Sequence, residues 1–305
     1  MAVRQTIDPP AYRRIVQITL FFVTAIIVTG ASVRLSGSGL GCPTWPRCTS
    51  TQMVDISSPH RAVEQINRLF TGGVTVACAV AFSGAFLRRP YRRDLAWFGA
   101  LLVAGVLLQA VIGGIVVLLE LQWESVALHF IASFVLLYGN LELLRRAGAG
   151  PGPRTLCVPI TIRRHTETVF GLLLVVLALG TVVTGAGPHG GDAHVRRLDW
   201  PVEDAARLHS IAVWVLVATT LWLAARLQRL GLREQFDRAG TLVAAMVFQG
   251  AVGYVQWFNR VPPVLVGIHV LGAALVFMAA TQLRFGSFVA PPEIIAVEST
   301  ATATA

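Results

Sequence analysis

The sequence predicts an all-α integral membrane protein whose eight transmembrane helices form two tandem four-helix bundles, related by a pseudo-two-fold axis along the membrane normal. Three observations support this fold class: the composition, eight long apolar segments and an internal repeat. Hydrophobic residues make up 54% and charged residues 13% of the 305 residues, and the mean hydropathy is +0.65. Such a composition leaves too little polar surface for a soluble protein of this length.

The apolar segments are each about 20 residues long, which is enough to cross a hydrocarbon core about 30 Å thick. They lie at residues 15–35, 63–87, 95–118, 123–144, 167–187, 204–228, 237–257 and 263–284. The first segment is longer than the apolar region of a signal peptide, and no small-residue cleavage site follows it. We therefore expect it to remain as the first helix.

The basic residues are all arginine, and they orient the predicted bundle. Most of the 25 flank the segment ends on the side of the N-terminus, so the sequence predicts a cell-membrane protein of bacterial type with both termini in the cytoplasm. The net charge of +9 then reflects topology. Nucleic-acid binding would need the basic residues on one folded surface, so we expect no nucleic-acid partner.

An internal repeat divides the chain into halves. The segment at 27–31 is echoed at 182–186, and the segment at 109–113 is echoed at 249–253. Because four helices return the chain to its starting side, both halves should have the same orientation in the membrane. The predicted organisation is an N-terminal four-helix half at 1–150, a C-terminal four-helix half at 151–285 and a disordered tail at 286–305.

Four polar residues lie at matched positions in the even-numbered apolar segments. Asn67, His129, His209 and His269 are each four to six residues past the outer end of their segment, no more than about 10 Å deep at 1.5 Å per residue. Imidazole in hydrocarbon is costly and is functional by default, although a single membrane histidine can equally be a packing residue. Ligands at equal depth on facing helices suit haem iron, whose axial ligands approach from opposite faces.

Cysteines occur in two settings. Cys42 and Cys48 share a Gly/Pro-rich outer loop, in a compartment where disulfides persist, so we expect a disulfide between them; the alternative is two free thiols. Cys78 lies within the second apolar segment and Cys157 lies in an inner loop. We expect both of these to be inert.

With these features the chain resembles the haem A synthase family, the membrane enzymes that convert haem O to haem A for cytochrome oxidase. The resemblance rests on the duplicated bundle, the paired loop cysteines, a glutamate near the start of the second segment, the Gly-Pro-His-Gly-Gly-Asp sequence at 187–192 and the histidines of three even-numbered segments. It implies that the C-terminal half holds haem b between His209 and His269. It also implies that the N-terminal half receives haem O, with both haems toward the outer leaflet.

The resemblance further implies an oxidoreductase that oxidises the C8 methyl group of haem O to a formyl group, through a hydroxymethyl intermediate and with water as oxygen source. Glu64 is the catalytic candidate, because a carboxylate beside the substrate can stabilise positive charge or accept a proton from water. The alternative role for Glu64 is helix capping. The implied partners are haem O, the haem O synthase that supplies it, an unidentified electron acceptor, the lipid bilayer and a possible second copy of the chain.

One position departs from the family pattern. The family has Glu-x-x-His-Arg where residues 64–68 read Glu-Gln-Ile-Asn-Arg, so Asn67, a poor iron ligand, replaces a histidine. His129 is then the predicted ligand of the substrate haem iron. His60 lies one turn before Glu64 and shares its face if the helix begins early enough; it either compensates for Asn67 or is a solvated interfacial residue.

Arginines on the outer side are candidates for binding haem propionates, because a guanidinium can donate two parallel hydrogen bonds to a carboxylate. The candidates are Arg68, Arg207, Arg197 and Arg260. Each can also be an interfacial anchor.

Two other functions remain open from the sequence. A dihaem b-type electron-transfer cytochrome would need two complete histidine pairs, and Asn67 counts against it. A non-enzymatic haem carrier would leave Glu64 without a chemical role.

Overall fold

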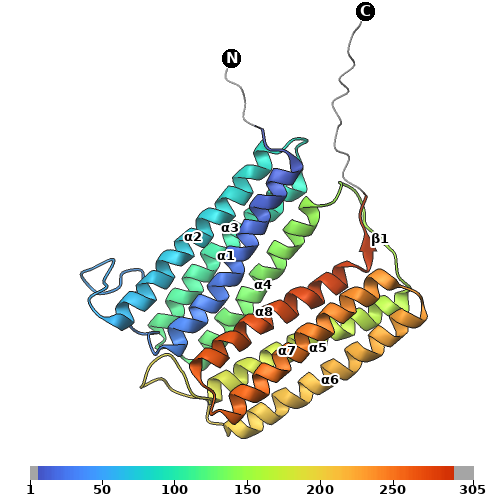
Figure 1. Cartoon of the computed structure of the whole chain (residues 1–305). Coiled ribbons are helices and arrows are strands. Elements are labelled where there is room, and N and C mark those ends of the chain that lie inside the picture. The colour runs from blue at the N-terminus through green and yellow to red at the C-terminus, as the bar shows by residue number, and fades with distance from the viewer. Residues whose placement is uncertain (1–5, 292–305) are drawn as a thin grey trace, which may run out of the picture.

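The computed structural model describes residues 6–291 and contains, within them, eight helices long and apolar enough to cross a membrane (Figure 1). The helices are α1 (Pro9–Leu35), α2 (Pro59–Leu87), α3 (Arg93–Leu118), α4 (Trp123–Ala147), α5 (Ile160–Ala186), α6 (Val202–Arg229), α7 (Arg233–Phe258) and α8 (Pro263–Phe285). Each corresponds to one predicted segment, so the all-α eight-span fold class is confirmed.

Several helices begin earlier than the apolar segments that predicted them, and at α1 and α2 a polar side chain caps the extended start. The side chain of Asp8 accepts a hydrogen bond from the backbone N–H of Ala11, and α1 starts with two prolines at Pro9. At α2, Ser58 accepts a hydrogen bond from the N–H of Arg61. Asp and Ser are preferred N-cap residues, and proline is tolerated in the first turn, where its missing N–H costs nothing.

Each half of the chain forms its own four-helix bundle (Figure 1). Within each bundle, consecutive helices pack together and the last helix packs on the first. Helices α2 and α4 therefore lie diagonally across one bundle, and α6 and α8 across the other. The bundles meet where α1 packs on α8, α4 on α5 and α4 on α8. A two-fold relation makes α1 equivalent to α5 and α4 equivalent to α8, so the contact of α1 with α8 and that of α4 with α5 are equivalent contacts. The observed contacts agree with this relation, and the axis itself stays a prediction.

The short turns at the outer ends of the bundles support the repeat. Here "outer" denotes the end that carries the α1–α2 connection, following the predicted orientation. Between α3 and α4, Glu120 and Leu121 have φ values of 51° and 59°, and between α7 and α8, Arg260 and Val261 have φ values of 61° and 56°. Left-handed backbone is uncommon for such residues. The same pair of conformations therefore recurs at equivalent places in the two halves.

The sealed hydrophobic core occupies the inner half of both bundles. Its fully or almost fully buried side chains include Val16, Leu102, Leu137, Leu173, Leu223, Leu242 and Leu283. In the described even-numbered helices, the outer stretches contain no buried residue: 66–73, 123–133, 206–215 and 263–271. The outer stretches of these even-numbered helices are thus packed less tightly than their inner halves, at the level of the four polar residues.

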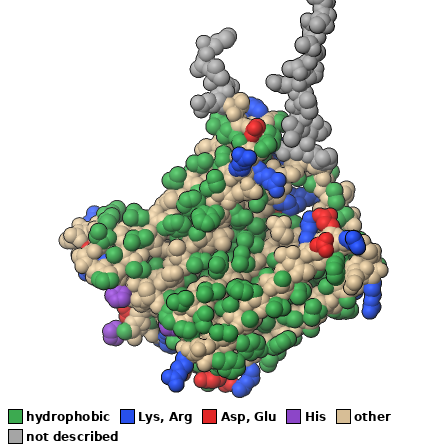
Figure 2. All heavy atoms as spheres, in the orientation of Figure 1, with side chains coloured by type: hydrophobic (Ala, Val, Ile, Leu, Met, Phe, Trp, Pro, Cys, Tyr) green, Lys and Arg blue, Asp and Glu red, His purple; other side chains and the backbone are tan. Residues whose placement is uncertain are grey.

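The surface is that of a multi-pass membrane protein. Figure 2 shows hydrophobic side chains along the sides of the helices and charged side chains gathered toward their ends. Large apolar side chains are exposed there, among them Phe21 at 67%, Val135 at 69% and Val247 at 66%. Exposed apolar area of this extent is typical of a surface covered by lipid.

The two termini of the C-terminal half are joined by a small sheet. Strand β1 (Thr155–Leu156) pairs antiparallel with β2 (Phe288–Val289), and the N–H of Gly150 donates to the carbonyl of Pro291 over 2.8 Å. Residues 286–291, assigned to the tail from the sequence, are therefore ordered. Strands of two residues are too short to give a periodic sequence signal. The rest of the predicted tail, 292–305, lies outside the described residues.

Candidate functional site

The four polar residues predicted to share one depth do so. Asn67, His129, His209 and His269 lie six to eight residues past the first residue of α2, α4, α6 and α8, which corresponds to about 9–12 Å along each helix. Because these helices are diagonal partners within their bundles, the four side chains form one pair in each half. This depth coincides with the loosely packed outer stretches.

The pair of the C-terminal half consists of two imidazoles. His209 and His269 lie close enough to interact electrostatically. The Nδ1 atom of His209 lies 3.1 Å from the carbonyl oxygen of Val176. Since a carbonyl only accepts, Nδ1 carries the proton and the lone pair is on Nε2. A backbone carbonyl that fixes the tautomer in this way is typical of metal-binding histidines.

A glycine of the preceding helix makes room for each imidazole. A Cβ atom added at these glycines would lie 3.2–3.4 Å from a ring Cε1 atom: Gly113 faces His129, Gly180 faces His209, and Gly253 faces His269. Sequence reasoning recognised Gly113 and Gly253 only as parts of the internal repeat, and it missed Gly180. A glycine near the outer end of the helix before each histidine is the signal that identifies all three.

The pair of the N-terminal half consists of an amide and an imidazole. Asn67 Oδ1 and His129 Nδ1 are both buried and, among the described residues, have no hydrogen-bond partner. The same is true of Nδ1 of His269 in the other half. Buried polar atoms without partners are costly. Both halves therefore present unsatisfied polar atoms at the depth where the packing is loose.

Glu64 connects α2 to the outer loop. It is 5% exposed, and its Oε2 accepts a hydrogen bond from the N–H of Cys42 over 2.7 Å. Its Oε1 lies 2.6 Å from Nη2 of Arg68. Because the cap of α2 is Ser58, more than a turn earlier, the capping alternative for Glu64 does not hold. The carboxylate instead lies beneath the loop, one turn from Asn67.

The loop over this half is closed by the expected disulfide between Cys42 and Cys48. Arg68 donates to the carbonyl of Cys42 over 3.3 Å and to that of Thr44 over 3.0 Å. Trp45 packs against α3, since a Cβ added at Gly114 would lie 2.5 Å from its indole ring. Gly114 adjoins the glycine that faces His129, so the loop covers the outer end of the N-terminal site.

Comparison with known proteins decides the family. Residues 13–203 match the COX15-CtaA family, described as Cytochrome oxidase assembly protein. The chain belongs to this family. The match covers more than half of the chain, including almost all of the N-terminal bundle and the whole of α5. It ends before His209 and His269, whose pairing rests on the structure.

Individual family members are similar over shorter lengths. A haem A synthase of Geobacillus kaustophilus (strain HTA426) is 33% identical over 124 residues, which cover 39% of this chain and 37% of the relative. The haem A synthase of Shewanella oneidensis (strain MR-1) is 29% identical over 216 residues, which cover 65% of this chain and 63% of the relative. The chain therefore matches less than two thirds of the length of these relatives.

In this member of the COX15-CtaA family, His60 lies at the rim of the N-terminal site. Helix α2 begins at Pro59, so His60, Glu64 and Asn67 do share one helix face. His60 is exposed, and its Nδ1 lies 3.0 Å from the Oγ of Ser38 in the outer loop. Its direct contact is thus with the loop.

The four candidate propionate ligands differ in availability. Arg68 is engaged by Glu64 and by loop carbonyls. Arg207 is exposed and pairs with Asp204 over 3.0 Å, and Arg260 is exposed. Arg197 is half-buried and has no ion pair within residues 6–291. Of the four, Arg197 is the partly buried cation still available to an anion.

The donor set fits haem. In the C-terminal half two imidazoles face each other across a loosely packed bundle, one with its Nε2 lone pair free. In the N-terminal half one imidazole and one amide have unsatisfied buried atoms. Imidazole is a common axial ligand of haem iron, and bundle cores build such sites from facing helices.

Proposed function

We propose that this protein is a haem A synthase, which oxidises the C8 methyl group of haem O to a formyl group through a hydroxymethyl intermediate, with water as oxygen source. The observation that carries the proposal is the asymmetry of the two sites: a complete histidine pair in one half, and a single histidine beside the buried carboxylate of Glu64 in the other. The overall change releases protons and electrons, so an external electron acceptor is required.

His209 and His269 would hold haem b as the resident cofactor, which would supply a one-electron carrier beside the substrate half. The hydrogen bond from His209 to Val176 keeps its Nε2 directed toward the bundle. The glycines beside each ring leave no side chain that could displace the imidazoles. Two strong ligands favour permanent retention.

His129 would bind the iron of the substrate haem O from one side, opposite Asn67. An amide is a weak iron ligand, so this half holds its haem through one strong bond. One strong ligand suits a molecule that must enter, react and leave. The outer loop with its disulfide covers this site, and we expect it to limit access of bulk water.

Glu64 would act on the water that attacks the substrate. Arg68 and the N–H of Cys42 hold its two carboxylate oxygens in place, and a carboxylate positioned beside the substrate can accept a proton or stabilise developing positive charge. The same contacts anchor the loop. A test must therefore separate chemistry from loop anchoring.

The decisive experiment is expression in a bacterial host that makes haem O but lacks its own haem A synthase, followed by haem extraction. We expect haem A from the native chain. Glu64→Gln keeps an acceptor for the Cys42 N–H but removes the charge, and we expect it to lower haem A formation by roughly 10²–10⁴-fold, the range for a general base. Glu124→Gln is the matched control, because Glu124 is an exposed glutamate at the same end of the molecule.

The outcomes separate the alternatives. Bound haem b without any haem A from the native chain would favour an electron-transfer cytochrome or a haem carrier. Normal haem A from Glu64→Gln would leave Glu64 with loop anchoring only. Thiol alkylation of each variant shows whether the disulfide loop is intact, so a loss of activity through loop opening is recognised.

A further inference from the structure

Two arginines meet at the outer junction of the bundles. Arg34 lies at the end of α1, and Arg197 lies in the α5–α6 connection; both are half-buried, and their charges repel each other. A Cβ added at Gly190 would lie 2.7 Å from the guanidinium carbon of Arg197, and one added at Gly191 would lie 3.3 Å from Cγ of Arg34. The adjacent glycines thus give both side chains their space.

Neither guanidinium has an anionic partner. Within residues 6–291, Arg34 and Arg197 make no ion pair or side-chain hydrogen bond. Three other outer arginines have carboxylate partners: Arg61 with Asp55 at 2.7 Å, Arg68 with Glu64 at 2.6 Å, and Arg207 with Asp204 at 3.0 Å. The remaining ones, at positions 47, 196 and 260, are exposed to solvent. The two arginines at the junction are therefore like charges, partly desolvated and uncompensated.

Such an arrangement is unfavourable unless an anion is bound. Burial lowers the pKa of Arg197 from its usual value, yet arginine stays charged in proteins. The cost of desolvation and mutual repulsion is therefore not relieved by loss of a proton. A carboxylate between the two planar guanidinium groups would relieve both costs through paired charge-assisted hydrogen bonds.

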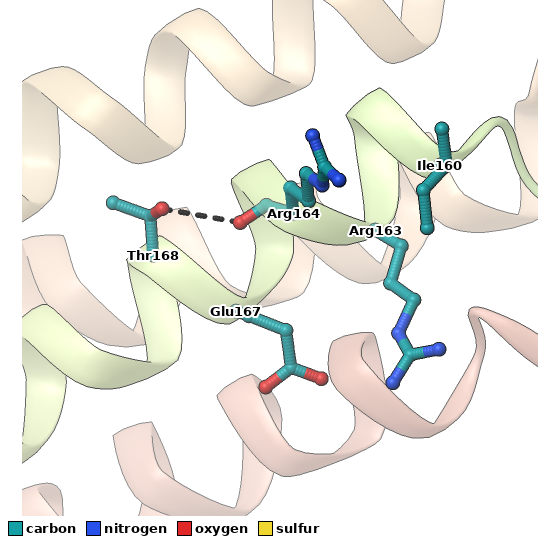
Figure 3. Close-up of a pocket in the computed structure, with 5 residues that line it drawn as sticks. All are labelled: Ile160, Arg163, Arg164, Glu167 and Thr168. Carbon is teal, nitrogen blue, oxygen red and sulfur yellow. Dashed lines mark hydrogen bonds between the residues drawn. The ribbon is translucent and has the colours of Figure 1, made fainter.

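A second arginine pair shows what is special about the junction. Arg163 and Arg164 line a hollow at the inner end of α5, and Figure 3 shows their guanidinium groups pointing away from each other. Arg164 is exposed, and Arg163 stacks over the ring of Phe288. Glu167, in the same hollow, pairs with Arg284. The two guanidinium groups are thus apart, one exposed to solvent and the other stacked on an aromatic ring, so neither requires a bound anion.

We propose that Arg34 and Arg197 form one anion-binding site, built by both halves of the chain, that binds a carboxylate. The identity of the carboxylate rests on the proposed function: it is a propionate of the haem held by His209 and His269. The α5–α6 connection is fixed to the end of α5 by a 3.0 Å hydrogen bond from the N–H of Leu198 to the carbonyl of Gly185, and it leads directly into α6, which carries His209. Haem b bound there would also link the two bundles through Arg34.

The test compares haem b with its dimethyl ester, which lacks the carboxylates. The purified full-length chain is loaded with either form, and the rate of haem transfer to apomyoglobin is measured. The variants are Arg34→Gln and Arg197→Gln, with Arg196→Gln as the control at an exposed neighbour. We expect each variant to release haem b roughly 10- to 100-fold faster, the effect of losing a charged hydrogen bond, and to release the ester no faster than the native chain does.

Three results would overturn the site. The first is that the native chain holds haem b and the ester equally well. The second is that the variants release both forms faster to the same extent, which would indicate a structural role for the arginines. The third is that inorganic phosphate stabilises the haem-free chain, that this effect needs both arginines, and that the two haem forms are released alike. That result would identify a dissolved anion as the ligand. A chain that holds haem b through both arginines but yields no haem A would support this site and refute the proposed function.

Discussion

The two bundles place their polar pairs at the same depth but cover them differently. Over the N-terminal pair, the connection at 36–58 is closed by a disulfide and tied down by Glu64 and Arg68. Over the C-terminal pair, the shorter connection at 187–201 packs its glycines against arginines. A duplicated unit can therefore keep its helices and specialise through its outer connections.

The pairs themselves differ in composition. The C-terminal pair has two imidazoles, one of them with its tautomer fixed by a backbone carbonyl, whereas the N-terminal pair has one imidazole, His129, opposite the amide of Asn67. We expect permanent binding in the first case and exchange in the second. The predictions below test this difference, beginning with the largest expected effect.

Removing a histidine should have opposite consequences in the two halves. His209→Ala or His269→Ala should abolish the low-spin haem b spectrum of the purified protein, because loss of an axial ligand costs more than the 10- to 100-fold typical of its outer-shell partners. His129→Ala should leave that spectrum unchanged and abolish haem A formation. Absorption spectra of reduced protein and haem extraction provide the two measurements.

The reverse pattern would contradict the assignment. If His129→Ala removed the resident haem while His269→Ala retained it, cofactor and substrate halves would have to be exchanged.

Completing the N-terminal pair should convert exchange into retention. Asn67→His would place a second imidazole opposite His129, and two strong ligands favour a bound haem. We expect purified Asn67→His to carry about two haems per chain where the native protein carries about one, with slower formation of free haem A. Haem content per chain and multiple-turnover rates check this. An unchanged haem content would show that the residue at position 67 does not face the iron.

The fold was predictable because membrane spans give long, simple signals. Runs of about 20 apolar residues and the arginine bias define all eight helices, and the disulfide followed from two cysteines in one short loop. Helix starts were less predictable, because capped extensions such as the one from Pro9 to residue 15 are polar or mixed. The order in residues 286–291 depends on pairing with β1, and two-residue strands leave no pattern.

The arrangement of the candidate site residues was predictable where they repeat along the sequence, and not where contacting residues are distant in sequence. Similar positions in the apolar segments placed His129, His209 and His269 at one depth without the structure; their role as ligands stays a prediction. The pairing of Arg34 with Arg197 could not be predicted, since more than 160 residues separate them and neither belongs to a motif. The contact of Trp45 with Gly114 likewise depends on how the loop folds back onto α3.

A small change in α3 should disturb only the connection at 36–58, which lies over the N-terminal pair. Gly114→Ala would place a Cβ 2.5 Å from the Trp45 ring, and overpacking of this kind typically costs about 1–3 kcal/mol. We expect the loop to be displaced, with faster proteolysis between Cys42 and Ser58 and reduced haem A formation. The resident haem b spectrum should stay unchanged.

Gly250→Ala provides the matched control, since a Cβ there would meet no atom within 4 Å. Equal proteolysis of the two variants would mean that Trp45 does not hold the loop on α3.

The smallest expected effect is that acid loosens the disulfide-closed connection at 36–58. Hydrogen bonds from Ser57, together with the nearby Arg61, hold the pKa of Asp55 below its usual value, and its carboxylate lies 2.7 Å from the Arg61 guanidinium. Because the folded-state pKa is lowered, this contribution is fully present above the unfolded value near 4 and is lost as pH falls through the folded value. We expect cleavage of the 49–57 segment by pepsin to accelerate over that acid range in native protein.

In Asp55→Asn the acceleration should be absent, because the loop is already loosened at every pH. Asp204→Asn should behave as the native chain does, because Asp204 pairs with Arg207 at an exposed site of the other half. An identical pH profile for Asp55→Asn and native protein would show that this ion pair does not hold the cover.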